Sequence, residues 1–132
     1  MALIVQKYGG TSVGSVERIE AVADRIAKNH ATGDQLIVVV SAMSGETNRL
    51  LGLASDLTPD PSPRELDVLV STGEQVSMAL LSMALHERGI PALSLKGSQV
   101  AIRTDSFHNK ARIQSIDDRR LRSELAAGKV VV

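Results

Sequence analysis

The sequence predicts an α/β fold, with a mostly parallel sheet that helices cover on both faces. Short apolar runs alternate along the chain with longer segments of helical periodicity, which is the pattern of that fold class. The run at residues 36–40 is continuous rather than alternating, as is typical of a strand covered on both faces. Residues 3–40 read as strand, helix and strand, which predicts parallel pairing through a right-handed crossover.

The first unit has clear boundaries. Residues 3–5 are predicted to form a buried strand that halts at Lys7, before two adjacent glycines. From Val16 the apolar residues follow helical spacing. Ser15 is the expected N-cap of this helix and Gly33 its expected stop.

The middle of the chain reads as three helices. One spans residues 47–57 and ends at a loop, 58–63, that holds three of the four prolines. The next is expected to start with Ser62 as N-cap and Pro63 at its first position, with Glu65 completing a capping box. A break is expected at residues 71–73. A further helix then runs to about residue 84 and ends before Gly89 and Pro91.

The last third begins with a predicted strand at residues 92–95. Residues 100–102 and 111–113 are expected to form a short hairpin. Asp117 is the expected cap of a final helix that ends at Gly128. Residues 130–132 then start another apolar strand with no following element, so we expect the sequence to be cut from a longer protein.

The amino-acid composition excludes several classes of function. With 132 residues and 43% hydrophobic content, the chain suits one globular domain. Fifteen basic and fifteen acidic residues leave no net charge to favour nucleic acid or an anionic membrane, and two aromatic residues are too few for a base-stacking platform. Because there is no cysteine, disulfides and thiolate chemistry are excluded. No signal peptide or stretch of ~20 apolar residues is evident, so we expect a cytoplasmic protein.

Ligands of parallel sheets bind beyond the carboxyl ends of the strands, which directs attention to residues 7–12, 41–47 and 96–98. In the first stretch, paired glycines let backbone amides approach an anion, and Lys7 adds a full charge. The alternative is a strand-end lysine and a tight turn. Ser41 and Thr47 are equally explained as cap or turn residues, and Glu74 as a helix-capping carboxylate.

Three stretches carry a family resemblance. They are KYGGTSV at residues 7–13, VVVSAMS at residues 38–44 followed by Thr47, and STGE at residues 71–74. In kind and order they resemble the signatures of aspartate kinases, within the broader amino-acid kinase family. The resemblance runs over essentially the whole chain. It implies a three-layer sandwich that is incomplete at the C-terminus of this sequence.

The resemblance implies phosphorylation of the β-carboxylate of L-aspartate by ATP, with Mg²⁺ bound to the nucleotide rather than to a protein metal site. This is the first step of lysine, threonine and methionine synthesis. Lys7 would be catalytic and would contact ATP together with Gly9, Gly10, Thr11 and Ser12. Substrate would be held by Ser41, Thr47 and Glu74.

The resemblance also indicates what this stretch of chain lacks. The family places an arginine and an acidic residue in a later glycine-rich motif, which is followed by the second half of the sheet and by ACT domains. We therefore expect residues 1–132 alone to be inactive, and the full-length parent to be a homo-oligomer. Two alternatives stay open. One is a related kinase acting on glutamate, acetylglutamate or a nucleotide, and the other is a non-catalytic fragment that pairs through an exposed sheet edge at Val130.

Overall fold

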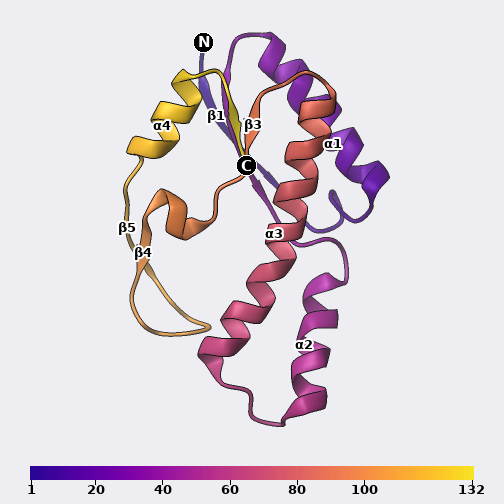
Figure 1. The fold of residues 1–132 in the computed structure, drawn as a ribbon, viewed down its shortest axis with the longest axis vertical. Coiled ribbons are helices and arrows are strands. Elements are labelled where there is room, and N and C mark those ends of the chain that lie inside the picture. The colour runs from indigo at the N-terminus through magenta and orange to yellow at the C-terminus, as the bar shows by residue number, and fades with distance from the viewer.

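The computed structural model describes residues 1–132, which form a four-stranded sheet, four α-helices and a small two-stranded sheet (Figure 1). In chain order the elements are β1 (Leu3–Tyr8), α1 (Val16–Ala31), β2 (Gln35–Val40), α2 (Glu46–Leu57), α3 (Pro63–Glu87), β3 (Ala92–Leu93), the 3₁₀ turn η1 (Gly97–Val100), β4 (Ile102–Thr104), β5 (Ile113–Ile116), α4 (Arg119–Ala126) and β6 (Val130–Val131).

The main sheet is parallel throughout, with strand order β1-β2-β6-β3. The predicted pairing of the first two strands is confirmed, in a register that runs from Leu3 opposite Gln35 to Tyr8 opposite Val40. The last strand, β6, lies between β2 and β3, and Val130, Val131 and Val132 are all buried. The expectation of an unpaired edge at Val130 is therefore wrong, because the chain returns to the middle of the sheet after α4.

The core lies between the sheet and helices α1 and α3. Strand β2 sends Leu36 and Val38 into it, where they join Ile26 of α1 and Leu81 of α3. Burial of apolar side chains on one helix face is what makes these amphipathic segments fold as helices here. The opposite face of the sheet is covered in part by α4, whose Leu121 shares a cavity wall with strand residues.

Strand β1 is at the edge of the sheet and is buried on one side only. Tyr8 faces the core, whereas the side chains of Leu3 and Val5 on the other face are 46% and 62% exposed. The expectation of a buried first strand therefore holds for the face that α1 and α3 cover. Lys7 alternates with Tyr8 and is exposed.

Helix α3 is continuous over 25 residues, so the predicted break at residues 71–73 is wrong. The hydroxyls of Ser71 and Thr72 donate to the carbonyls of Val68 and Leu69, at 2.8 and 2.7 Å, within the same helix. Both hydroxyls are therefore hydrogen-bonded within α3, and neither residue ends the helix. At the helix start, Pro63 is the first residue as predicted, but the side chain of Ser62 makes no capping hydrogen bond.

The other helix ends agree more closely with the sequence. Ser15 accepts a hydrogen bond from the amide of Arg18 at 3.2 Å, and Gly33 has a φ of +88°, as a helix stop requires. The final helix begins at Arg119 with Asp118 at the N-cap position, one residue later than predicted. The predicted hairpin forms as the antiparallel pair β4 and β5, shifted by a few residues.

By length and composition alone, α3 is apolar enough to cross a membrane, which differs from our expectation for this sequence. Within the fold it packs against α1 and α2, and Leu81 and Leu85 are fully buried. Core helices of globular domains satisfy the same criterion.

Candidate active site

Two loops meet at the carboxyl ends of β1 and β2. The amide of Ser41 donates to the carbonyl of Tyr8 at 3.0 Å, which joins the strand ends. Glycine permits the close approach that follows. A Cβ on Gly10 would lie 3.1 Å from the carbonyl oxygen of Ala42, and one on Gly14 would lie 3.2 Å from Cβ of Ser44. The loop after β1 is thus packed directly on the loop after β2.

A cavity of about 420 Å³ opens where these loops meet the middle of α3. Of the residues singled out from the sequence, Gly10, Thr11, Ser41, Thr47 and Glu74 line it. They come from three separate stretches of chain, and the fold brings them together. Neutral donors, including hydroxyls and the side-chain amide of Asn48, form most of its polar wall, and Glu74 is the one charged residue on it.

The helix that borders this cavity is α2. Gly45, at its N-cap position, has a φ of +79° and offers no side chain to cap the first turn. The amides of Thr47 and Asn48 therefore lack a capping partner at the positive end of the helix, beside the cavity. Such a terminus binds carboxylate or phosphate oxygens. The sequence pointed instead to the start of α1, but no residue of α1 lines the cavity.

Glu74 reaches the site because of the residue before it. A Cβ on Gly73 would lie 2.9 Å from Cβ of Ala42, so only glycine lets α3 pass this close to the loop after β2. Glu74 sits in the middle of α3, and its interpretation as a helix-capping carboxylate is wrong because no helix begins there. Its carboxylate has no hydrogen bond or ion pair within the chain and lines two neighbouring cavities.

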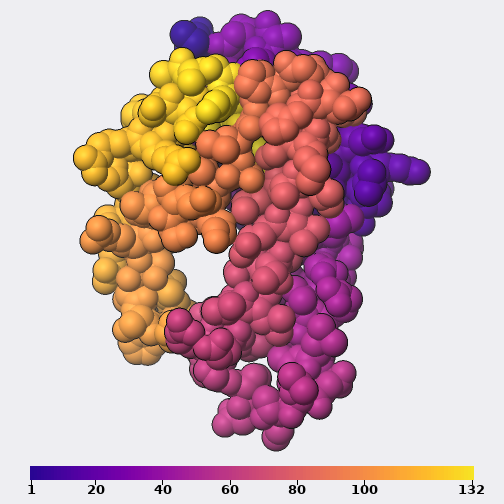
Figure 2. Space-filling view, viewed as in Figure 1, coloured from indigo at the N-terminus to yellow at the C-terminus, as the bar shows by residue number.

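The second cavity is larger, about 620 Å³, and lies over the carboxyl ends of β2 and β6. Its wall is mainly apolar, with Glu74, Lys96 and Ser98 among its polar members. The third stretch flagged from the sequence, residues 96–98, is therefore beside the site, as the topology of a parallel sheet predicts. Figure 2 shows the molecule hollowed on this side, between α3 and the β4–β5 hairpin.

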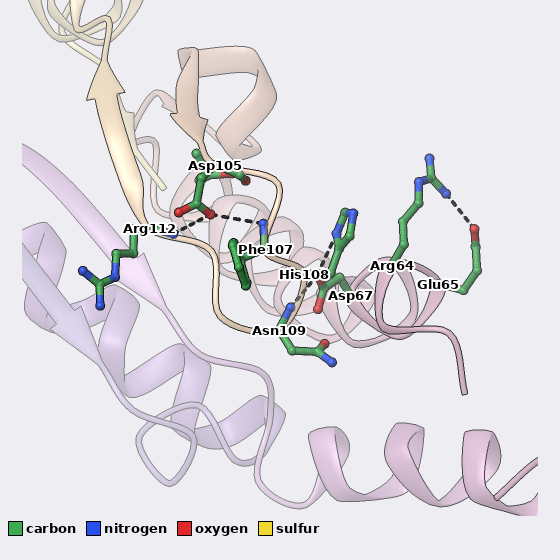
Figure 3. Close-up of polar contacts among 9 residues, drawn as sticks. Arg64, Glu65, Asp67, Asp105, Phe107, His108, Asn109 and Arg112 are labelled. Carbon is green, nitrogen blue, oxygen red and sulfur yellow. Dashed lines mark hydrogen bonds and ion pairs between the residues drawn. The ribbon is translucent and has the colours of Figure 1, made fainter. Parts of the chain in front are cut away.

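The tip of that hairpin is tied to the start of α3 (Figure 3). Asp67 accepts a hydrogen bond from the amide of Asn109 at 3.0 Å, and Nδ1 of His108 lies 3.3 Å from the same carboxylate. Asp105 shapes the tip by accepting from the amides of Phe107 and Arg112, each at 3.2 Å. These contacts close the ring of chain around the hollow in Figure 2.

Lys7 stands apart from the smaller cavity. Its neighbour Tyr8 is buried in the core, and that burial raises the pKa of the phenol. Because side chains alternate along a strand, the exposed Lys7 projects from the opposite face. There it pairs in register with Val39, which lines the larger cavity. Lys7 forms no ion pair within the chain, and Gly9 and Ser12 do not line either cavity.

One further site residue escaped the interpretation of the sequence, and a neighbouring arginine is committed elsewhere. Asn48 lines the cavity from the first turn of α2, a place that its position next to Thr47 could have indicated. Arg49 is the nearest guanidinium in sequence, but it donates to both carboxylate oxygens of Glu46, at 3.0 and 2.5 Å. Those hydrogen bonds hold the pKa of Glu46 below its usual range, so Arg49 is already committed to this pair.

Comparison with known proteins agrees with this arrangement. The sequence profile described as "Amino acid kinase family" matches residues 2–132. An aspartate kinase of Pseudomonas putida is 65% identical over 132 residues, which are 100% of this chain and 32% of that protein. The chain thus spans about a third of the length of the curated relatives it matches.

Solved structures share the fold. Aspartate kinase from Synechocystis superposes with a TM-score of 0.82 at 51% identity, covering 98% of this chain and 21% of that one. E. coli aspartokinase III, in complex with aspartate and ADP, gives a TM-score of 0.80 at 23% identity over 99% of this chain and 40% of its own. From the profile match over nearly its whole length, the chain belongs to the amino acid kinase family.

Proposed function

We propose that the protein containing this chain is an aspartate kinase, which transfers the γ-phosphoryl group of ATP to the β-carboxylate of L-aspartate. The observation that carries this is the cavity where Thr47, Ser41 and Glu74 meet the glycine turn after β1. The relatives support the substrate, because proteins 65% and 66% identical over the whole chain are named aspartate kinase and aspartokinase.

Aspartate presents an ammonium and two carboxylates, and the cavity offers a group for each kind of charge. Glu74 is the only charged residue on the wall and has no partner within the chain, and we assign it to pair with the ammonium. Thr47 and Ser41 carry hydroxyl donors, and the uncapped first turn of α2 adds backbone amides for a carboxylate. Selection for an α-amino acid then rests on Glu74.

The phosphate side of the proposal rests on the turn after β1. The amides of Gly9 and Gly10 and the hydroxyls of Thr11 and Ser12 would hold phosphate oxygens. Lys7 would reach the transferring group from the neighbouring strand position and would stabilise its developing charge. A Cβ on Gly10 would lie 3.1 Å from the carbonyl oxygen of Ala42, so the tight fit on that side requires a residue without a side chain and leaves the peptide bare.

The chemistry needs alignment more than covalent help. An oxygen of the β-carboxylate attacks the γ-phosphorus, the bond from that phosphorus to the bridging oxygen breaks, and ADP leaves with the electron pair. Mg²⁺ would screen the repulsion between the two anions, and in such sites phosphates and water supply most of its ligands. From this chain the reaction would need only neutral donors, Glu74 and Lys7, which lies outside the smaller cavity and would reach the phosphates from the end of β1.

The rest of the proposal concerns the whole protein. Because relatives are about three times as long, we propose that segments beyond this chain complete the nucleotide site and that residues 1–132 alone do not turn over ATP. We place the enzyme in the cytoplasm, where its substrates are made. A kinase acting on glutamate, acetylglutamate or a nucleotide is the competing function, and the names of the relatives do not support it.

The test is aspartyl phosphate formation by the full-length protein, trapped with hydroxylamine, with glutamate and acetylglutamate as competing acceptors. We expect aspartate to be phosphorylated and the other two acceptors not to be. Glu74→Gln should raise the KM for aspartate by roughly 10- to 100-fold, as loss of a charged partner does, with a smaller effect on the KM for ATP. Lys7→Met should lower kcat by about 100-fold or more.

A matched control separates these roles from general damage. Lys28→Met removes an exposed lysine on α1, away from both cavities, and should leave kinetics unchanged. Full activity of Lys7→Met would refute the phosphate assignment. An unchanged aspartate KM in Glu74→Gln would refute the ammonium assignment, and aspartate-dependent ATP turnover by residues 1–132 would refute the expected division of the site.

A further inference from the structure

The β4–β5 hairpin is held to the rest of the fold at its base and at its tip. At the base, the amide of Asp117 donates to the carbonyl of Ala101 at 3.4 Å, next to the buried Val100. Every residue from 106 to 116 is exposed. A two-stranded ribbon without a buried face is marginally stable in water, and segments with few buried contacts open more readily than the core. The position of the hairpin therefore depends on what its tip contacts.

The tip is fastened to α3 by a single carboxylate (Figure 3). Oδ2 of Asp67 accepts a hydrogen bond from the amide of Asn109 at 3.0 Å and lies 3.3 Å from Nδ1 of His108. Asp67 makes every hydrogen bond and ion pair that joins residues 102–116 to another element. Its side chain is 38% exposed and that of His108 is 45% exposed, so water competes for both contacts. The tip is thus held by a contact that can open.

The tip keeps its own shape without α3. The carboxylate of Asp105 accepts from the amides of Phe107 and Arg112, each at 3.2 Å, and its amide donates to the carbonyl of Arg112 at 3.1 Å. Asn109 has a φ of +68°, which asparagine tolerates better than most residues do. Because these contacts lie within the loop, the hairpin can leave Asp67 and move as one unit.

The base of the hairpin has the backbone of a hinge. Ala101 has a φ of +50°, in the left-handed region that a residue with a Cβ rarely adopts. Strained backbone of this kind is found at switch regions, where a second conformation relieves the strain. Rotation at Ala101 would carry the paired residues 102–116 together, because β4 and β5 are hydrogen-bonded to each other.

The closed hairpin spans the larger cavity. Ile102 of β4 lines one part of the wall, and Glu74 of α3 lines another. Asp67 and Glu74 are seven residues apart on α3, which places them on the same side of the helix and about 10 Å apart along its axis. Figure 2 shows the hollow bounded by α3 on one side and by the hairpin on the other. The contact at Asp67 therefore closes the rim of the cavity that Glu74 borders.

We propose that the β4–β5 hairpin is a strap over the larger cavity. Asp67 latches it through Asn109 and His108, and it swings about Ala101 to admit and release ligands at Glu74. Its effect on turnover rests on the proposed function, whereas the motion itself does not. The competing interpretation is a fixed brace, in which the tip stays on α3 throughout the reaction.

Spin-label distances test the motion in the full-length protein, with cysteines elsewhere replaced. Nitroxides are attached at Ser106→Cys on the tip and at Leu57→Cys, which is 89% exposed at the end of α2. Asp67→Ala removes both latch contacts and should raise the ratio of a second distance to the latched one by about 10-fold. Glu65→Ala is the matched control, because this carboxylate pairs with Arg64 at 2.6 Å and contacts no hairpin residue. The same distance distribution in Asp67→Ala and the parent would overturn the proposal.

A reversible disulfide tests the consequence for turnover, because residues 1–132 contain no cysteine. In the double variant Asp67→Cys/Asn109→Cys, oxidation locks the tip on α3 and reduction releases it. If opening admits substrate or releases product, oxidation should lower kcat of the full-length enzyme by at least ~10-fold, and a reducing agent should restore it. The two single variants control for thiols elsewhere in the full-length protein.

Two outcomes of the disulfide experiment contradict the strap. Full activity of the oxidised double variant would show that the tip need not move. Equal loss of activity in the oxidised and reduced forms would show that the contact is a brace. If the unmodified full-length protein does not phosphorylate aspartate, the proposed function fails instead, and the spin-label distances alone decide whether the hairpin moves.

Discussion

Gly73→Ala tests the contact that sets Glu74 in the site. The added methyl would lie 2.9 Å from Cβ of Ala42, and Ala42 is 4% exposed, so neither group can move into solvent. Overpacking of this kind costs about 1–3 kcal/mol. Alanine is the better helix former by about 1 kcal/mol, which offsets part of that cost. We therefore expect net destabilisation of roughly 0–2 kcal/mol, together with a raised KM for aspartate as α3 shifts.

The stabilisation that alanine gains from its higher helix propensity can be measured separately with Gly52→Ala in α2. Gly52 is also within a helix, but a Cβ there would meet nothing within 4 Å, so the change should stabilise the chain by about 1 kcal/mol. The two variants should thus differ by about 1–3 kcal/mol in urea unfolding. Adding Ala42→Gly to Gly73→Ala removes the clashing methyl and should recover the aspartate KM. If both alanine variants stabilise the chain equally, the close contact between α3 and the loop after β2 does not exist in solution.

Two further predictions concern stability. Ser15→Ala removes the 3.2 Å hydrogen bond to the amide of Arg18 and should lower stability by about 1 kcal/mol, whereas Ser62→Ala, at a start with no such bond, should change thermal unfolding less. Hydrogen bonds from Arg119 lower the pKa of Asp117 to about 2, below the value near 3.9 expected when unfolded, so its stabilisation is present above that value and is lost as pH falls through about 2. Acid unfolding of Asp117→Asn should therefore be less steep between about pH 4 and pH 2, and an unchanged slope would contradict this account.

Local signals in the sequence were sufficient for most of the fold. The Ser15 cap and the Gly33 stop of α1 depend on interactions within a few residues, and the strands on either side of it are marked by short apolar runs. The position of β6 was not accessible in this way, because it depends on where the chain re-enters the sheet after α4. Nor was the continuity of α3. Ser71, Thr72 and Gly73 are weak helix formers, and the continuity of the helix depends on its packing against α1 and α2, which sequence periodicity does not show.

The candidate site shows the same division. The rule for parallel sheets places the loops after β1 and β2 side by side, and Gly10, Thr11, Ser41 and Thr47 do share one cavity. From the sequence we assigned the start of α1 to the site, but the first turn of α2 borders the cavity and no residue of α1 lines it. That Lys7 lies on the exposed face follows from the alternation of side chains along β1. This conclusion requires knowing that the strand extends to Tyr8.

Helix α3 connects the packing with the candidate site. One side carries Gly73, which sets the distance to the loop after β2, and an adjacent side carries Glu74, which borders both cavities. A packed helix shifts as a unit, so a displacement where Gly73 meets Ala42 moves Glu74 relative to Thr47. The contact that limits how closely α3 approaches the loop after β2 therefore also sets the position of the one charged group on the wall of the smaller cavity.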